Sequence, residues 1–263
     1  MKILVNGDIH GRDFWKEPCN EIDKFDKLVF LGDYLDPYGF ENITVRDAIE
    51  NFKNIIDFAK NNMDKVVLLL GNHDMPYFSK TYKSFSMWHC RHAYDDYDEI
   101  AKIFEKNKNL FKIAHVEDDV LFTHAGCTSG WLKDVFTEQY KITSLDDLAF
   151  SLNNLLNTEN GLRYLYMVSR ERGGYDFNGS CIWADKNETY WDQVSKLDGE
   201  QRVHDIHSIK QVFGHTLQAF YDKDGRIVSG LPQEYFCCKM LDNRSAYVLD
   251  TEKFKVEQIK KES

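Results

Sequence analysis

The sequence predicts an α/β fold, and two observations support this prediction. Short apolar runs that end at glycine or threonine alternate with amphipathic helical patterns along the chain. Each run also delivers polar residues at its C-terminal end. The length of 263 residues suits one large α/β domain, and four prolines form no linker. We therefore expect a single domain over 1–263, with helical or loop insertions around 75–118 and 127–205 that shape a substrate pocket.

The predicted strands are continuous apolar runs, which are typical of strands buried on both faces. They are Lys2–Val5, Leu28–Leu31, Val66–Leu70, Val120–Phe122 and Gln211–Phe213. Near the C-terminus, Tyr235–Leu241 and Ala246–Asp250 are expected to form a hairpin or pair of strands that turns at Asp242-Asn243.

Two helices are predicted with their N-terminal caps. Over Thr44–Asn61, apolar residues recur at intervals of three and four, and Thr44 with Asp47 resembles a capping box. Over Ser144–Leu156, leucines and Ala149 form one stripe, and Ser144 is the expected N-cap. Helices between buried strands complete the α/β pattern.

Composition excludes several classes of protein. The chain carries 33 Lys and Arg against 43 Asp and Glu, a net charge of −10, so we expect no nucleic-acid backbone as a partner. No apolar run could cross a bilayer, and the first eleven residues leave no room for a signal-peptide apolar region, so we expect no membrane association and a cytoplasmic location. The six cysteines show no CxxC spacing and are expected to be free thiols.

The strand ends carry the residues suited to chemistry. In open α/β sheets, ligands bind outside the carboxyl ends of the strands. The residues expected there are Asp8, His10, Asp33, Asp36, Asn72, His73, His124 and His215. This mixture of nitrogen and oxygen donors suits divalent Mn, Fe or Zn. We expect Gly7 and Gly11 to free the backbone so that Asp8 and His10 come together.

Five ordered motifs resemble those of the calcineurin-like metallophosphoesterases. They are Gly7-Asp8-Ile9-His10-Gly11, Gly32-Asp33-Tyr34-Leu35-Asp36, Gly71-Asn72-His73-Asp74, Thr123-His124-Ala125-Gly126 and Gly214-His215-Thr216. Within that family the chain looks most like the phosphoprotein phosphatase branch and its bacterial and phage relatives, which include diadenosine tetraphosphatases. The resemblance implies a four-layer αββα sandwich, in which two mixed sheets are flanked by helices and a dinuclear metal site lies at the strand ends.

The resemblance also implies a set of metal ligands. Asp8, His10 and Asp33 would hold the first divalent ion, with Asp33 bridging to the second. Asn72, His124 and His215 would hold that second ion. Thr216 stands after His215, so the second histidine that some branches carry in this motif is absent. This favours the phosphatase-like branch.

Two divalent ions about 3.5–4 Å apart lower the pKa of a bridging water and supply hydroxide for an in-line attack on phosphorus. His73, next to Asn72, would then protonate the leaving alkoxide, and Asp36 would hold the imidazole in the useful tautomer. A general acid of this kind contributes about 10²–10⁴ in rate.

A phosphate substrate also needs cationic donors, for which arginine is best suited. The family usually has Asp-Arg-Gly where this chain has Asp36-Pro37-Tyr38, so the expected arginine is missing. The candidates to replace it are Arg12 and the pair Arg170 and Arg172. We favour the pair, because it resembles an Arg-x-Arg element of some bacterial members.

The predicted function is a metal-dependent phosphomonoesterase of the serine/threonine protein phosphatase type. A dinucleoside polyphosphate hydrolase or a phosphodiesterase is the alternative, so the substrate is a phosphoprotein or a nucleotide. A catalytically silent scaffold is disfavoured because all six ligand residues are present. A nuclease is disfavoured by the acidic charge.

Overall fold

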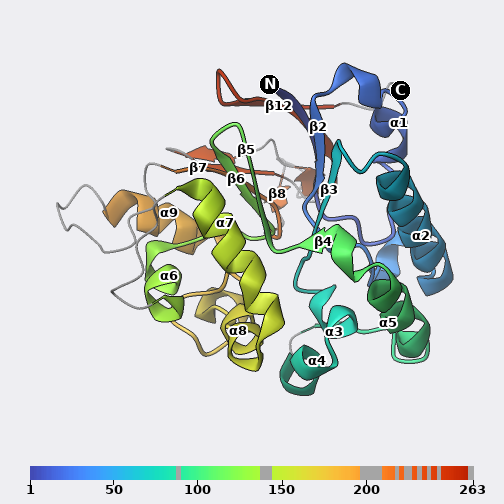
Figure 1. Ribbon diagram of the computed structural model, residues 1–263, viewed down its shortest axis with the longest axis horizontal. Coiled ribbons are helices and arrows are strands. Elements are labelled where there is room, and N and C mark those ends of the chain that lie inside the picture. The colour runs from blue at the N-terminus through green and yellow to red at the C-terminus, as the bar shows by residue number, and fades with distance from the viewer. Residues whose placement is uncertain are drawn as a thin grey trace.

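The computed structural model contains two main β-sheets with helices around them (Figure 1). It describes residues 1–86, 90–136, 144–195, 209–216, 219–221, 227–229, 233–235, 238–241 and 244–259. The six-stranded sheet has the order β13-β12-β1-β2-β3-β4, and the five-stranded sheet has the order β10-β11-β7-β6-β5. Both sheets mix parallel and antiparallel pairs. The predicted α/β class with two mixed sheets and flanking helices is confirmed.

The strands of the first sheet are β1 (Lys2–Asn6), β2 (Lys27–Phe30), β3 (Val66–Leu69), β4 (Phe111–Lys112), β12 (Ala246–Asp250) and β13 (Lys255–Gln258). Those of the second are β5 (Ala114–Glu117), β6 (Val120–Thr123), β7 (Lys210–Phe213), β10 (Gln233–Tyr235) and β11 (Cys238–Met240). β8 (Ala219–Tyr221) and β9 (Ile227–Ser229) form a separate antiparallel pair. β1, β2 and β3 run parallel, so their carboxyl ends lie at one edge of the first sheet. β6 and β7 also run parallel, so their carboxyl ends lie at one edge of the second sheet.

The helices are α1 (Lys16–Cys19), α2 (Val45–Asn61), α3 (Met75–Phe78), α4 (Lys80–Ser86), α5 (Tyr97–Lys106), α6 (Ser129–Val135), α7 (Leu145–Asn154), α8 (Glu159–Leu165) and α9 (Lys186–Ser195). Helices α2 and α5 lie beside the first sheet, while α6, α7 and α8 lie beside the second (Figure 1). The segment 75–118 contributes β4 and β5 as well as helices α3 to α5. None of the described helices is long and apolar enough to cross a membrane.

The central strands are apolar throughout because each of their faces meets a different part of the core. In β1, Ile3 and Val5 pack with Phe122 and Val212 of the second sheet, whereas Leu4 between them packs with Phe52 of α2 and its neighbours. All six side chains named here are fully buried. Alternating side chains of one strand therefore serve both layers.

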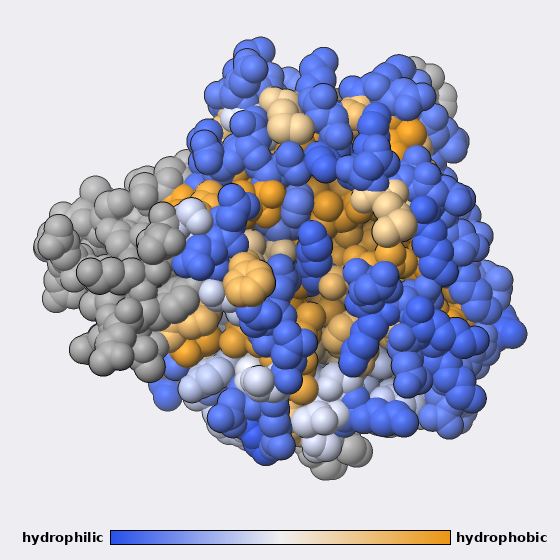
Figure 2. Space-filling model, in the orientation of Figure 1, coloured by the Kyte–Doolittle hydropathy of each residue, from blue (hydrophilic) through white to orange (hydrophobic). Residues whose placement is uncertain are grey.

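The two predicted helices start at the predicted caps. The Thr44 hydroxyl accepts the Asp47 N–H and the Asp47 carboxylate accepts the Thr44 N–H, which completes the capping box of α2. The Ser144 hydroxyl accepts the Asp147 N–H at the start of α7, which ends at Asn154 before a 3₁₀ turn. Figure 2 shows hydrophilic residues covering the outer side of α2, whose other side packs on the core.

The predicted C-terminal pair of strands exists, but the prediction that it is a hairpin is wrong. β11 pairs with β7 in the second sheet, whereas β12 pairs with β1 and β13 in the first. The predicted turn, Asp242-Asn243, lies outside the described residues. Tyr247 and Leu249 of β12 are buried between the sheets beside Ile3, so burial places β12 next to β1. Apolar runs alone do not say which sheet a strand joins.

Candidate metal centre

The ends of five strands bring the predicted ligand residues together. Asp8 and His10 follow β1, Asp33 follows β2, Asn72 follows β3, and His124 and His215 follow β6 and β7. All six side chains are buried. Parallel pairing aligns the strand ends within each sheet, and the packing of the sheets brings both edges to the same place.

Two histidines face the carboxylate of Asp33 from opposite sheets. His10 Nδ1 donates to the Leu35 carbonyl at 2.8 Å, and His124 Nδ1 donates to the Leu31 carbonyl at 2.8 Å. In the neutral rings these bonds leave the Nε2 atoms without protons. The His10 Nε2 lies 3.4 Å and the His124 Nε2 lies 3.5 Å from the same atom, Asp33 Oδ2.

Further acceptor atoms surround the Nε2 atom of His124. Asn72 Oδ1 lies 3.0 Å and His215 Nδ1 lies 3.1 Å from it. The amide nitrogen of Asn72 points to Cys90 Sγ at 3.7 Å, which turns the amide oxygen toward His124. The buried Nε2 of His215 has no hydrogen-bond partner among the described residues. A neutral His215 carries its proton on one ring nitrogen and a lone pair on the other. The lone pairs of His124, Asn72 and His215 are thus gathered in one buried place, which suits a cation.

The pKa values of these groups suit ligand chemistry. Burial lowers the pKa of His10 to about 3 and that of His215 well below the usual value, so both imidazoles keep a lone pair. Burial opposes ionisation of Asp33, but the neighbouring His124 and His73 outweigh it and lower the pKa of Asp33 to about 2. Burial raises the pKa of Asp8 to about 6.

Two groups of side chains could each hold a divalent ion, and they share Asp33. The first group is His10, Asp33 and His73, and the second is Asp33, His124 and His215; the ligand atoms of each lie within 4.8 Å of one another. Asp8 lies in neither group. Its Oδ1 accepts the His215 N–H at 3.1 Å and lies 4.0 Å from His124 Nδ1. His73 therefore has a place in the first group that the sequence did not indicate.

Unusual backbone conformations aim these side chains. His10, Asp33 and His215 have φ angles of +44°, +52° and +65°, in the left-handed region that few residues other than glycine adopt. Gly11 also has a positive φ, as expected, but Gly7 does not, so His10 itself makes the turn. Gly71 is needed for space, since any side chain there would overlap the Asp33 carboxylate.

Asp74 connects two of the ligand loops. Its buried carboxylate accepts the backbone N–H groups of Asp33 at 2.7 Å, Tyr34 at 2.9 Å and Gly71 at 2.8 Å. The loops after β2 and β3 are therefore held together beneath the ligands. Asp74 ends one of the motifs, but nothing in its local sequence indicates this bridging position.

Asp36 holds His73 from the side away from the ligands. Asp36 Oδ2 accepts from His73 Nδ1 at 2.9 Å, and Asp36 Oδ1 accepts the Tyr77 hydroxyl at 2.6 Å. Tyr77 in turn accepts the Ala93 N–H at 2.7 Å. Burial acts to lower the pKa of His73, but the charges of Asp33 and Asp36 prevail and raise it. The sequence did not indicate this role of Tyr77, which depends on its contact with Asp36, 41 residues away in the chain.

Comparison with known proteins decides the family. The family model of the calcineurin-like phosphoesterases matches residues 1–219, most of the chain. The chain belongs to the calcineurin-like phosphoesterases. It is therefore a metal-dependent hydrolase of phosphoric esters, and the predicted resemblance is confirmed. No curated protein matches the chain.

The fold of this phosphoesterase is also similar to solved structures. One of them, "Crystal structure of a putative diadenosine tetraphosphatase", aligns over 98% of this chain and 92% of that chain. The identity is 15% and the TM-score is 0.45.

The three predicted phosphate-binding arginines of the phosphoesterase lie in different surroundings. Arg12 is bound to Glu41 by Nε at 3.0 Å and by a second guanidinium nitrogen at 3.1 Å. Arg172 lies 3.8 Å from an Asp185 oxygen, and its charge helps burial to lower the pKa of His215. Arg170 is exposed and donates to the Tyr175 carbonyl at 3.4 Å. Of the pair, Arg172 is the one beside the ligand residues.

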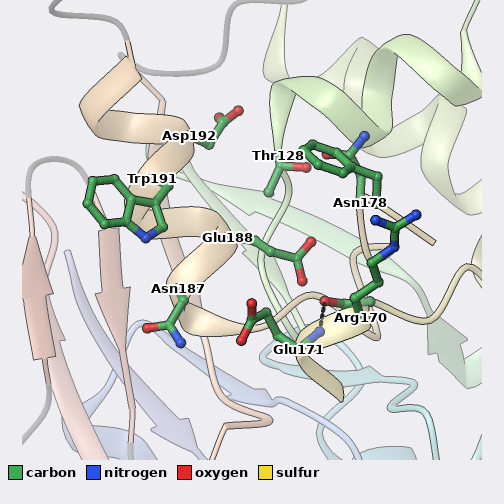
Figure 3. A pocket seen from close by; sticks show the side chains of 10 residues that line it. Thr128, Arg170, Glu171, Asn178, Asn187, Glu188, Trp191 and Asp192 are labelled. Atoms are coloured by element: carbon green, nitrogen blue, oxygen red, sulfur yellow. Dashed lines mark hydrogen bonds between the residues drawn. The ribbon is translucent and has the colours of Figure 1, made fainter. Parts of the chain in front are cut away.

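Arg170 lines a cleft of about 520 Å³ between α9 and the loop before it. Figure 3 shows Trp191 and Asn187 of α9 on one side and Arg170 and Asn178 on the other. Phe177 and Trp191, which also line the cleft, are 79% and 64% exposed. Exposed aromatic rings beside an arginine are suited to a planar group.

Proposed function

We propose that this phosphoesterase is a phosphomonoesterase of the serine/threonine protein phosphatase type. The observation that carries the proposal is the position of Asp33 Oδ2 between His10 Nε2 and His124 Nε2, at 3.4 and 3.5 Å. A carboxylate oxygen shared by two donor groups suits a pair of divalent ions. Asp8, His10 and Asp33 would hold one ion, and Asp33, Asn72, His124 and His215 the other. The nitrogen and oxygen donors favour Mn, Fe or Zn.

The bound ions would neutralise phosphate charge and lower the pKa of water in the site. The protein supplies the proton for the leaving group through His73, whose ring Asp36 holds by Nδ1 so that Nε2 is free to act. Tyr77 fixes Asp36 from behind. Arg172 is suited to bind phosphate oxygens near His215. Arg12 and Arg170 are weaker candidates, because Glu41 pairs with Arg12 and because Arg170 lines the cleft beside α9.

A dinucleoside polyphosphate hydrolase or phosphodiesterase is the second candidate. The cleft with Phe177 and Trp191 supports it, because a nucleotide substrate brings a planar base along with its phosphates. A phosphopeptide brings no planar base.

We further propose that residues 1–263 form one domain, since strands from both sheets share the buried cluster between them.

The test compares three substrates at equal enzyme concentration: a phosphoserine peptide, diadenosine tetraphosphate and bis-p-nitrophenyl phosphate. We expect hydrolysis of p-nitrophenyl phosphate to stop in EDTA and return with Mn²⁺, and the peptide to be the best of the three. Full activity in EDTA would contradict the proposal. A preference for diadenosine tetraphosphate would establish the second candidate instead, and elemental analysis of the purified protein identifies the metals.

A further inference from the structure

Arg91 lies beside the residues proposed to donate the proton. Its guanidinium donates to the backbone carbonyl of Asp36 at 3.0 Å and lies 4.0 Å above the ring centre of Tyr38. The Tyr38 ring packs edge-on against His10, with ring centres 5.0 Å apart. Arg91 is exposed, yet two contacts hold its guanidinium over the loop that carries Asp36.

The other nearby arginines already have carboxylate partners. Arg12 also faces the Tyr38 ring, at 5.5 Å, but Glu41 binds its guanidinium from two sides. Arg172 lies 3.8 Å from an Asp185 oxygen. Within the described part of the chain, no carboxylate pairs with Arg91; its recorded contacts are a carbonyl oxygen and an aromatic face. Its charge is thus the least neutralised of the three.

The loop beneath Arg91 cannot supply a cation of its own. None of the three residues of this turn, Asp36-Pro37-Tyr38, has a basic side chain. The planar guanidinium of Arg91 uses one nitrogen for the Asp36 carbonyl and has further N–H groups for an anion. Tyr38 supports the flat face of the guanidinium and limits its freedom.

We propose that Arg91 binds the phosphoryl group of the substrate, supplying from the segment before α5 the cation that the 36–38 loop lacks. The proposal rests on the proposed phosphatase function. Arg91 would bind it near His73, and Arg172 would bind it near His215. A dianionic phosphomonoester gains more from the second cation than a monoanionic phosphodiester does.

The experiment measures binding of inorganic phosphate to the Mn²⁺-loaded protein by calorimetry, and kcat and KM for p-nitrophenyl phosphate. The variants are Arg91→Gln, which keeps a polar side chain but removes the charge, and Arg91→Ala with and without added guanidinium. Arg46→Ala is the control, because Arg46 is an exposed arginine of α2 that pairs with Glu99. Thermal melting checks that each variant is folded.

We expect both Arg91 variants to bind phosphate about 10- to 100-fold more weakly and to raise KM more than they lower kcat. Guanidinium should partly restore Arg91→Ala, and the control should match the wild type. Unchanged phosphate affinity in folded Arg91→Gln, with an active wild type, overturns the inference and leaves the proposed function intact. If the wild type hydrolyses no phosphoric ester with any metal, the proposed phosphatase function is overturned. The calorimetric comparison of phosphate binding by the wild type and the Arg91 variants then tests the role of Arg91 by itself.

Discussion

The strongest test of the proposed chemistry is the substitution Asp36→Asn. The Asp36 side chain is 1% exposed and its two oxygens bind His73 at 2.9 Å and Tyr77 at 2.6 Å. A hydrogen bond to a charged group contributes about 1.5–3 kcal/mol, and 1.36 kcal/mol corresponds to a tenfold change in rate. If that bond stabilises the proton-donating form of His73, kcat should fall about 10- to 150-fold on substrates whose leaving group needs a proton.

The assay compares a phosphoserine peptide with p-nitrophenyl phosphate, whose leaving group departs without a proton. Asp36→Asn should lower kcat strongly on the peptide and little on the aryl ester. The pH profile provides a second readout. Burial acts to lower the pKa of His73, but the charges of Asp33 and Asp36 raise it overall. Loss of the Asp36 charge should therefore lower the pKa of His73 and move the alkaline limb of the kcat–pH profile to lower pH.

The control is Asp57→Asn, an exposed carboxylate of α2, which should behave as the wild type. Equal losses on the two substrates would refute the assignment of His73 as the acid and Asp36 as its partner. An unchanged alkaline limb would refute the coupling between them.

Three further substitutions or conditions test the ligands and their support. Asp33→Asn should bind neither ion, so elemental analysis that still finds two metals per chain would exclude a bridging Asp33. Asp74→Ala leaves three backbone N–H groups without their acceptor and should lower the free energy of unfolding in urea by at least about 3 kcal/mol; a loss below 1 kcal/mol would contradict this. The gain in melting temperature from Mn²⁺ should shrink as pH falls through about 6, because burial raises the pKa of Asp8 to about 6 and a protonated carboxyl is a poor ligand. A gain that stays constant between pH 5 and 8 would argue against Asp8 as a ligand.

Much of the fold and the set of candidate ligands could be predicted because the signals are local. A run such as Leu28–Leu31 is apolar because both faces of its strand are buried, and Thr44 caps a helix by contacts only three residues away. Parallel strands then bring their carboxyl ends together, so the ends of β1, β2 and β3 could be expected to meet. The pairing of the C-terminal strands was not predicted, since their partners lie far along the chain.

The tertiary structure alone decided which groups support those ligands. Asp36 and Arg91 are separated by 55 residues, and Asp33 and Asp74 by 41. Such contacts depend on how helices pack around the sheets, which no local pattern of residues encodes. The sequence by itself therefore determined the donor chemistry and the strand ends that present it, whereas packing determined the bridge at Asp74, the support of Asp36 by Tyr77, and the position of Arg91.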